Sequence, residues 1–176
     1  MARLVSVVFQ QRSRWETLSN GSTVQDMLGV LEAAFEQDLK RLDRPGWDWF
    51  ERELRPLLGC SVYEFPFDRA AGIGRAEAPH ARLLMTRAES LDQASEGLSE
   101  LFGQPILLQA KNVASTKEYG GMYQAVLHQF RPPLEYLDKV YATRQVEHFY
   151  SPDDIEAFRS HWTRPVVNDG PKPSAP

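Results

Sequence analysis

The stretch that decides the fold spans residues 106–130 and reads ILLQAKNVASTKEYGGMYQAVLHQF. Its first part is a short apolar run with the length of a buried strand. Ser115 and Glu118 have the spacing of a capping box, which predicts that a helix begins at Ser115. Apolar residues then recur every three or four positions along one helical face: Tyr119, Met122, Tyr123, Val126, Leu127 and Phe130. The pattern predicts a strand, a polar loop and a helix.

The predicted loop has the chemistry of an anion site. It carries Asn112, Ser115, Thr116 and Lys117. Free backbone N–H groups at a helix N-terminus, hydroxyl groups and an ammonium group all favour negative charge. An ordinary strand-to-helix connection with a solvated lysine would contain the same residues, so the chemistry alone leaves both interpretations open.

The segment before this stretch predicts the partner of its strand. Residues 81–87 form a second candidate for a buried strand, and Ser90 with Gln93 predicts a capped helix over 90–102. A strand, a helix and a second strand over residues 106–112 make a βαβ unit. We therefore expect the two strands to pair in parallel.

Two further helices are marked by their N-terminal residues. Ser22 and Gln25 form a capping box ahead of an amphipathic helix over residues 22–40. Ser151 followed by Pro152 combines an N-cap serine with a proline at the first helical position, which predicts a helix from that point.

Composition indicates one ordinary globular domain. The chain has 176 residues, of which 25% are charged and 42% hydrophobic. We expect residues 1–162 to form the domain and the proline-rich residues 163–176 to be a disordered tail. The net charge of −4 argues against broad electrostatic binding to nucleic acid or to acidic membranes.

The single cysteine, Cys60, excludes an internal disulfide and a cysteine-based zinc site. The four histidines do not have metal-ligand spacing, so we expect no bound metal. No apolar run approaches the roughly 20 residues needed to span a bilayer, and the N-terminus has no signal-peptide pattern. These features predict a cytoplasmic protein.

Several segments match one known family in order along the chain. They are WFEREL at 49–54, Gly59, Val62-Tyr63, PFD at 66–68 with Gly72, LL at 83–84 with ESL at 89–91, NVASTKEY at 112–119 with Tyr123, YLDKVY at 136–141, HFYS at 148–151, Phe158 and Trp162. Together they make residues 2–162 resemble the capsular polysaccharide synthesis proteins, a sulfotransferase-like family named after its Asn-Lys-Trp-Tyr-Ser motif.

The resemblance implies a helix-rich, three-layer α/β fold of the P-loop type with a small, mostly parallel sheet. It also implies transfer of a sulfuryl group from 3′-phosphoadenosine-5′-phosphosulfate (PAPS) to a carbohydrate hydroxyl. Ser6 matches the serine that holds the 3′-phosphate in this family. With Asn112, Ser115 and Lys117 it would form the nucleotide-phosphate pocket. The place of Glu53 in the "W-F-D-x-E" match makes it the expected catalytic base.

The chain departs from the family pattern at several positions, among them Leu4, where asparagine is expected, and Glu51, where aspartate is expected. The phosphate-loop unit that opens the family's fold has no counterpart, and the naming motif keeps only Lys117 and Tyr119. A non-catalytic remnant or interaction domain that retains the fold is therefore the alternative to an enzyme. Because a sheet without its N-terminal strand leaves an unpaired edge, we also expect marginal stability or self-association.

Overall fold

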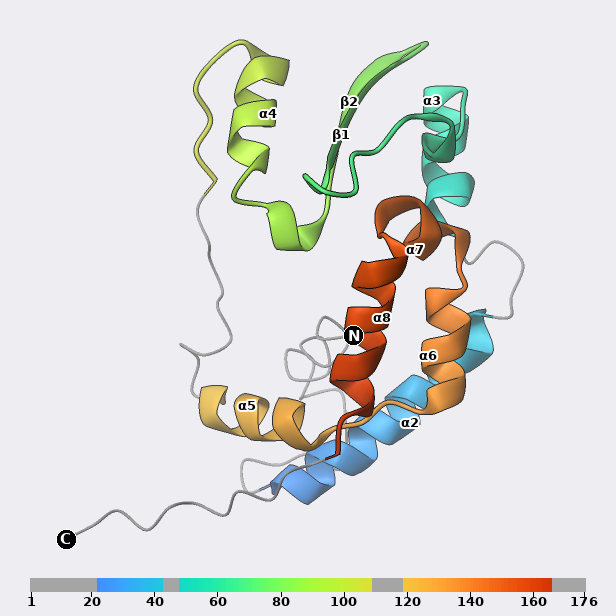
Figure 1. The fold of residues 1–176 in the computed structure, drawn as a ribbon, viewed down its shortest axis with the longest axis vertical. Coiled ribbons are helices and arrows are strands. Elements are labelled where there is room, and N and C mark those ends of the chain that lie inside the picture. Colours follow the sequence, from blue (N-terminus) through green and yellow to red (C-terminus); the bar gives the residue numbers. More distant parts are fainter. Residues whose placement is uncertain (1–21, 43–47, 109–118, 166–176) are drawn as a thin grey trace, which may run out of the picture.

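A computed structural model describes residues 22–42, 48–108 and 119–165. This part of the chain is helix-rich and carries one two-stranded hairpin (Figure 1). The α-helices are α2 (Val24–Leu42), α3 (Arg55–Leu58), α4 (Ala94–Phe102), α5 (Gly120–Gln129), α6 (Leu134–Tyr141), α7 (Arg144–Phe149) and α8 (Pro152–Thr163). A π-helical turn (Phe50–Leu54) and two 3₁₀ turns (Val62–Glu64 and Ala88–Ser90) connect them to the strands β1 (Ile73–Ala78) and β2 (Ala81–Thr86).

The long helix α2 confirms the helix expected over residues 22–40, with its cap one residue later than predicted. The Thr23 backbone N–H donates to the Asp26 carboxylate at 2.7 Å, and the Asp26 N–H donates back to the Thr23 hydroxyl at 3.3 Å. Thr23 and Asp26 therefore form the capping box that we placed at Ser22 and Gln25.

The hydrophobic core lies where α2, α5, α6 and α8 meet, at one end of the molecule in Figure 1. The Phe35 ring lies between the rings of Phe130 and Tyr136, with centroid distances of 4.9 and 4.7 Å. The Tyr136 hydroxyl donates to Asp38 at 2.8 Å, so its polar end is satisfied. Trp162 extends the core into α8. Periods of three and four in the sequence thus predict which faces are buried.

The hairpin stands at the other end of the molecule, between α4 and α3 (Figure 1). β1 pairs antiparallel with β2, from Ile73 opposite Thr86 to Ala78 opposite Ala81. The strand predicted over residues 81–87 is confirmed. The parallel pairing predicted between residues 81–87 and 106–112 is wrong, because β2 pairs with β1 instead. Only two residues connect these strands, which is enough for an antiparallel turn but not for a parallel crossover. In the part of the chain that is described, the sheet is this hairpin alone and no three-layer arrangement forms around it.

The segment expected as the second parallel strand follows α4 instead. The Ile106 N–H donates to the Ser99 hydroxyl at 2.8 Å, and the Leu108 N–H donates to the Ser95 hydroxyl at 3.0 Å. Two serines of α4, Ser95 in its first turn and Ser99 one turn later, therefore satisfy backbone groups that a strand partner would otherwise take. Residues 109–112, the remainder of the predicted strand, lie outside the described residues.

Helix α8 begins as predicted. The Ser151 hydroxyl accepts the Asp154 N–H, and Pro152 occupies the first turn. The helix continues through Thr163, where the predicted tail begins. Across the described ranges, none of the helices is both long and apolar enough to cross a membrane.

Candidate functional site

Four of the five predicted site residues lie outside the described residues. They are Ser6, Asn112, Ser115 and Lys117, so the nucleotide-phosphate pocket stays a prediction. Glu53 lies on the π-helical turn with about half of its side chain exposed. Its carboxylate pairs with Arg52 Nε at 2.7 Å. Its role as a base also stays a prediction.

Its neighbour Glu51 lies in a polar cluster rather than at the open surface. The buried Ser61 hydroxyl donates to the Glu51 carboxylate, and Arg55 Nη1 lies 2.9 Å from its other oxygen. Arg144 approaches the same carboxylate at 3.9 Å. The hydrogen bond from Ser61 lowers the pKa of Glu51, and the two arginines lower it further. Glu51 is therefore an ionised acceptor that ties the π-helical turn to α7.

Tyr63 completes this cluster. Its hydroxyl donates to Asp48 at 2.6 Å, and the Arg144 guanidinium lies 4.3 Å from the centre of its ring. Burial raises the pKa of Tyr63 far above its ordinary value, and the bond to Asp48 raises it further. Tyr63 is thus held as a neutral donor. Its ring packs edge-on against the His148 imidazole, with the two ring centres 5.3 Å apart.

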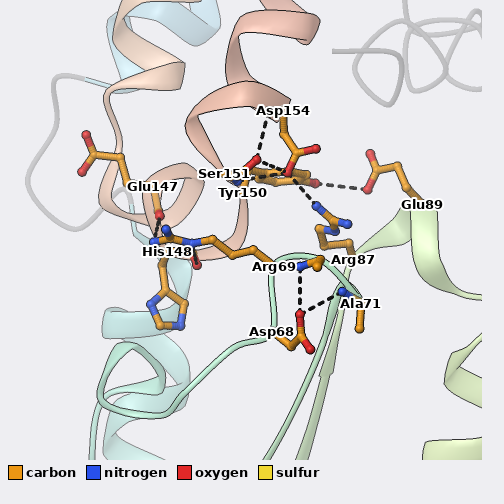
Figure 2. A network of polar contacts seen from close by, with 11 residues as sticks. Asp68, Arg69, Ala71, Arg87, Glu89, Glu147, His148, Tyr150, Ser151 and Asp154 are labelled. Carbon is orange, nitrogen blue, oxygen red and sulfur yellow. Dashed lines mark hydrogen bonds and ion pairs between the residues drawn. The ribbon is translucent and has the colours of Figure 1, made fainter.

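His148 leads from this cluster into a second network, drawn in Figure 2. Burial and the charges of Arg69 and Arg144 lower the pKa of His148 below its ordinary value. The imidazole is therefore neutral at pH 7. Its Nε2 atom is buried and finds no hydrogen-bond partner among the described residues. Buried polar atoms are usually hydrogen-bonded, so a buried imidazole nitrogen without a partner makes His148 a candidate for contact with a ligand.

The loop that enters the network is built around Asp68. Its carboxylate accepts the N–H groups of Ala70 and Ala71 at 2.8 and 2.9 Å, which closes a tight turn. Gly72 follows with φ of 71°, a conformation that side chains with a Cβ avoid. A Cβ on Gly72 would also lie 2.7 Å from Arg87 Nε. Glycine is therefore required here for both its backbone and its size.

The side chain of Arg69, in this loop, caps the C-terminus of helix α7. Its Nε donates to the His148 carbonyl at 3.1 Å and its Nη2 to the Glu147 carbonyl at 2.5 Å (Figure 2). Carbonyls at a helix C-terminus lack partners within the helix and carry partial negative charge. The guanidinium satisfies both carbonyls and holds residues 68–72, the β1 entry loop, against α7.

Arg87, the residue directly after β2, lies at the centre of the network. Its side chain is only 12% exposed, and Nη1 lies 3.2 Å from the Asp154 carboxylate. The guanidinium lies 5.2 Å from the centre of the Tyr150 ring, within cation–π range. Its Nε atom is buried with no partner among the described residues. Arg87 therefore joins the hairpin to the N-terminus of α8.

Asp154 receives that contact while capping its own helix. It accepts the Ser151 N–H at 3.0 Å and the Ser151 hydroxyl at 2.8 Å. These bonds to Ser151 lower the pKa of Asp154, and Arg87 adds to the effect. The carboxylate is therefore ionised over the physiological range, and the pair with Arg87 persists there.

The network ends at a cavity lined by aromatic rings. The Tyr150 hydroxyl donates to Glu89 at 3.1 Å (Figure 2). Burial raises the pKa of Tyr150 to about 12, and the Glu89 charge contributes. Both side chains also line a cavity of about 260 Å³, together with residues of α6, α7 and α8: Val140, Tyr141, Val146, Phe158 and Trp162.

The network joins segments that the sequence had already singled out for another reason. Asp68, Gly72, Glu89 and the stretch 148–151 all belong to the segments that carry the family resemblance. Arg69, Arg87 and Asp154 were not predicted as site residues. A possible signal for Arg87 was its position at the end of a strand; for Asp154 it was the acidic first turn. No group of three acidic, histidine or cysteine side chains in the described ranges could hold a metal ion.

Comparison with models of known protein families gives a match over most of the chain. Searches of curated proteins and of solved structures found none. Residues 24–151 match the NKWYS family, described as putative capsular polysaccharide synthesis proteins. That match covers most of the chain, including every element from α2 to α7. The chain therefore belongs to the NKWYS family.

Proposed function

We propose that this protein acts in capsular polysaccharide synthesis as a transferase that moves a sulfuryl group from PAPS to a carbohydrate hydroxyl. The family membership of residues 24–151 supports the role in capsule synthesis. The observation that carries the site is the convergence of the resembling segments. Glu89 and Tyr150 belong to two of these segments, 61 positions apart, and they form a hydrogen bond beside an aromatic cavity.

The proposed reaction needs a donor pocket and a base. A sulfur–oxygen bond to the donor phosphate breaks and a new one forms to the acceptor oxygen. The hydroxyl proton passes to a carboxylate, proposed to be Glu53, and adenosine 3′,5′-bisphosphate leaves. Such transfer depends on positioning and on stabilising charge at the leaving phosphate. We assign the stabilisation of charge at the leaving phosphate to four residues: Ser6, Asn112, Ser115 and Lys117.

Nucleotide binding is the direct test of the donor site. Because the phosphate-loop unit has no counterpart in this sequence, we expect the purified full chain to bind adenosine 3′,5′-bisphosphate weakly, which calorimetry at high ligand concentration measures. A lysine–phosphate contact contributes about 1.5–3 kcal/mol, so Lys117→Ala should weaken binding roughly tenfold or more. Lys40→Ala is the matched control, because it removes the same charge from the exposed surface of α2. Its affinity should equal that of the unmodified chain.

Transfer itself is tested with ³⁵S-labelled PAPS and capsular oligosaccharides as acceptors. Label that appears in the oligosaccharide and falls sharply with Glu53→Gln would support both the reaction and the base. If the chain neither binds the bisphosphate nor transfers label, the transferase proposal is wrong. The non-catalytic interaction domain would then be the better description of the fold.

A further inference from the structure

We propose that the aromatic cavity between α6, α7 and α8 is a subsite for one neutral sugar ring. This inference rests on the proposed function, because it supplies the place where an acceptor carbohydrate would be held. The cavity holds about 260 Å³. Pockets for drug-sized molecules run to about 300–1,000 Å³, so this one suits a single ring rather than an extended chain.

The residues that line the cavity differ in burial. Tyr141 and Trp162 are buried and belong to the hydrophobic core. Tyr150 and Phe158 are half-buried, and Glu89 is exposed. A lining of mostly buried aromatic rings with one exposed carboxylate suits a ring with apolar C–H faces and hydroxyl edges.

The rings of the lining are rigidly set by one another. Tyr141 and Phe158 lie nearly parallel, 23° apart, with centroids 6.4 Å apart, and Tyr150 meets Phe158 edge-on at 5.3 Å. Rings in mutual contact have little conformational freedom to lose on binding, so we expect an open ring face in this lining to stack on a pyranose at low entropic cost.

The charges at the cavity favour a neutral occupant. The lining residues include Glu89 and contain no lysine or arginine among the described residues. Two guanidinium groups lie over rings of the lining: Arg87 is 5.2 Å from the centre of the Tyr150 ring, and Arg159 is 5.5 Å from that of Tyr141. Each is paired with a carboxylate, Arg87 with Asp154 at 3.2 Å and Arg159 with Asp138 at 2.7 Å. A carboxylate accepts hydrogen bonds from sugar hydroxyls but repels an acidic sugar.

A larger hollow at the other end of the molecule lacks these features. It holds about 370 Å³ between the hairpin and α4. Its lining carries four charged side chains and no aromatic ring, so it offers no stacking surface: Arg75, Glu77, Arg82 and Glu100, with Ala76, Leu83, Leu84, Gly97 and Leu101. The choice between the two cavities therefore rests on chemistry and not on volume.

The subsite also borders the Arg87 network. Tyr150 and Glu89 belong to both, and the Tyr150 hydroxyl reaches Glu89 at 3.1 Å. A sugar hydroxyl that bonds to Glu89 would thus be linked through Tyr150 to Arg87. The sugar would lie directly beside the segments that carry the family resemblance.

The test compares two monosaccharide probes by saturation-transfer NMR and by titration of the full chain. Methyl β-D-glucopyranoside should bind, and methyl β-D-glucuronide should bind about fivefold more weakly, because a unit charge near Glu89 at the water-exposed mouth costs about 1 kcal/mol. Glu89→Gln should remove most of that difference. Glu96→Gln on α4, outside the cavity lining, should leave it unchanged.

A second variant probes the stacking surface. Phe158→Leu should weaken the neutral probe roughly three- to tenfold while Glu96→Gln does not. Circular dichroism and thermal unfolding confirm that each variant folds. If Phe158→Leu is unfolded, Glu89→Gln alone still decides the charge argument.

The outcomes separate the subsite from the proposed reaction. Neutral-probe binding that responds to these variants supports the subsite, even if no sulfuryl transfer is found. Sulfuryl transfer without any monosaccharide binding, or binding that ignores both variants, overturns the subsite and leaves the transferase proposal standing. Equal affinity of the unmodified chain for both probes overturns the preference for a neutral ring.

Discussion

Replacing Gly72 by alanine should destabilise the protein by more than backbone strain alone. At φ of 71°, a residue with a Cβ costs about 1–2 kcal/mol. The new Cβ would also lie 2.7 Å from Arg87 Nε and 2.9 Å from Ser90 Cβ. Ser90 is buried and Arg87 is paired with Asp154, so neither can move freely. Overpacking of this kind adds about 1–3 kcal/mol. The total loss should be about 2–5 kcal/mol.

Two other glycines separate the two causes. Gly103 has φ of 67° but no atom within 4 Å of its Cβ position, so Gly103→Ala reports strain without overlap. Gly29 lies in the middle of α2 with open space around it, and Gly29→Ala should stabilise the protein by about 0.5–1 kcal/mol. Urea unfolding followed by circular dichroism measures all three variants.

The difference between Gly72→Ala and Gly103→Ala isolates the overlap with Arg87 and Ser90. We expect it to be about 1–3 kcal/mol. If the two variants lose the same stability, the β1 entry loop does not pack against Arg87 as closely as the structure places it. In that case Gly72 would be required for its backbone alone.

Three further changes test the helix ends and the core. Ser151→Ala should cost about 1 kcal/mol through loss of the α8 cap, and a cost near zero in thermal unfolding would contradict the capping box. Asp154→Asn should cost stability at pH 7, and the gap should close as pH falls through the lowered pKa of Asp154, because the folded-state advantage exists only above that pKa. A gap that stays constant down to acid pH, where the carboxylate is protonated in both the folded and the unfolded state, would exclude the charge as its source. Tyr136→Phe should cost about 1.5–3 kcal/mol by leaving the Asp38 carboxylate without its 2.8 Å partner, and equal unfolding midpoints would refute that value.

The helices followed from the sequence because their signals are local. Ser151, Pro152 and Asp154 lie within four residues of each other and together determine where α8 begins. The start of α2 was misplaced by one residue because Ser22–Gln25 and Thr23–Asp26 have the same spacing. A carboxylate is a stronger hydrogen-bond acceptor than an amide, which explains why the second pair forms the box.

The pairing of the strands could not be read in the same way. β2 was recognisable as an apolar run, but its partner depends on which chain segment reaches its edge first. A two-residue connection from β1 closes at far lower entropic cost than a crossover through α4. The hydroxyls of Ser99 and Ser95 then accept hydrogen bonds from the backbone N–H groups of Ile106 and Leu108, which a neighbouring strand would otherwise bond. Two serines four positions apart on one helix are too common in sequences to predict that their hydroxyls bond the following segment.

The network around Arg87 was not predicted as a site, although several of its residues lie in the segments that carry the family resemblance. Arg87 and Asp154 are 67 positions apart, and Arg69 lies 79 positions from His148. No periodic pattern relates residues at such separations. A family resemblance marks which segments matter, yet it does not say which side chains meet. The structure supplies those pairs, and with them the cavity beside Tyr150.

The roles of the resembling residues differ once their contacts are known. Asp68 closes a turn, Gly72 admits Arg87, and Ser151 caps α8. Each holds a junction in place, so their presence reflects the needs of the fold before those of any reaction. His148 and Tyr150 are different, because one has an uncommitted buried nitrogen and the other lines a cavity. The part of the network that can face a ligand is therefore its α7–α8 side, and the loop on the hairpin side serves to position it.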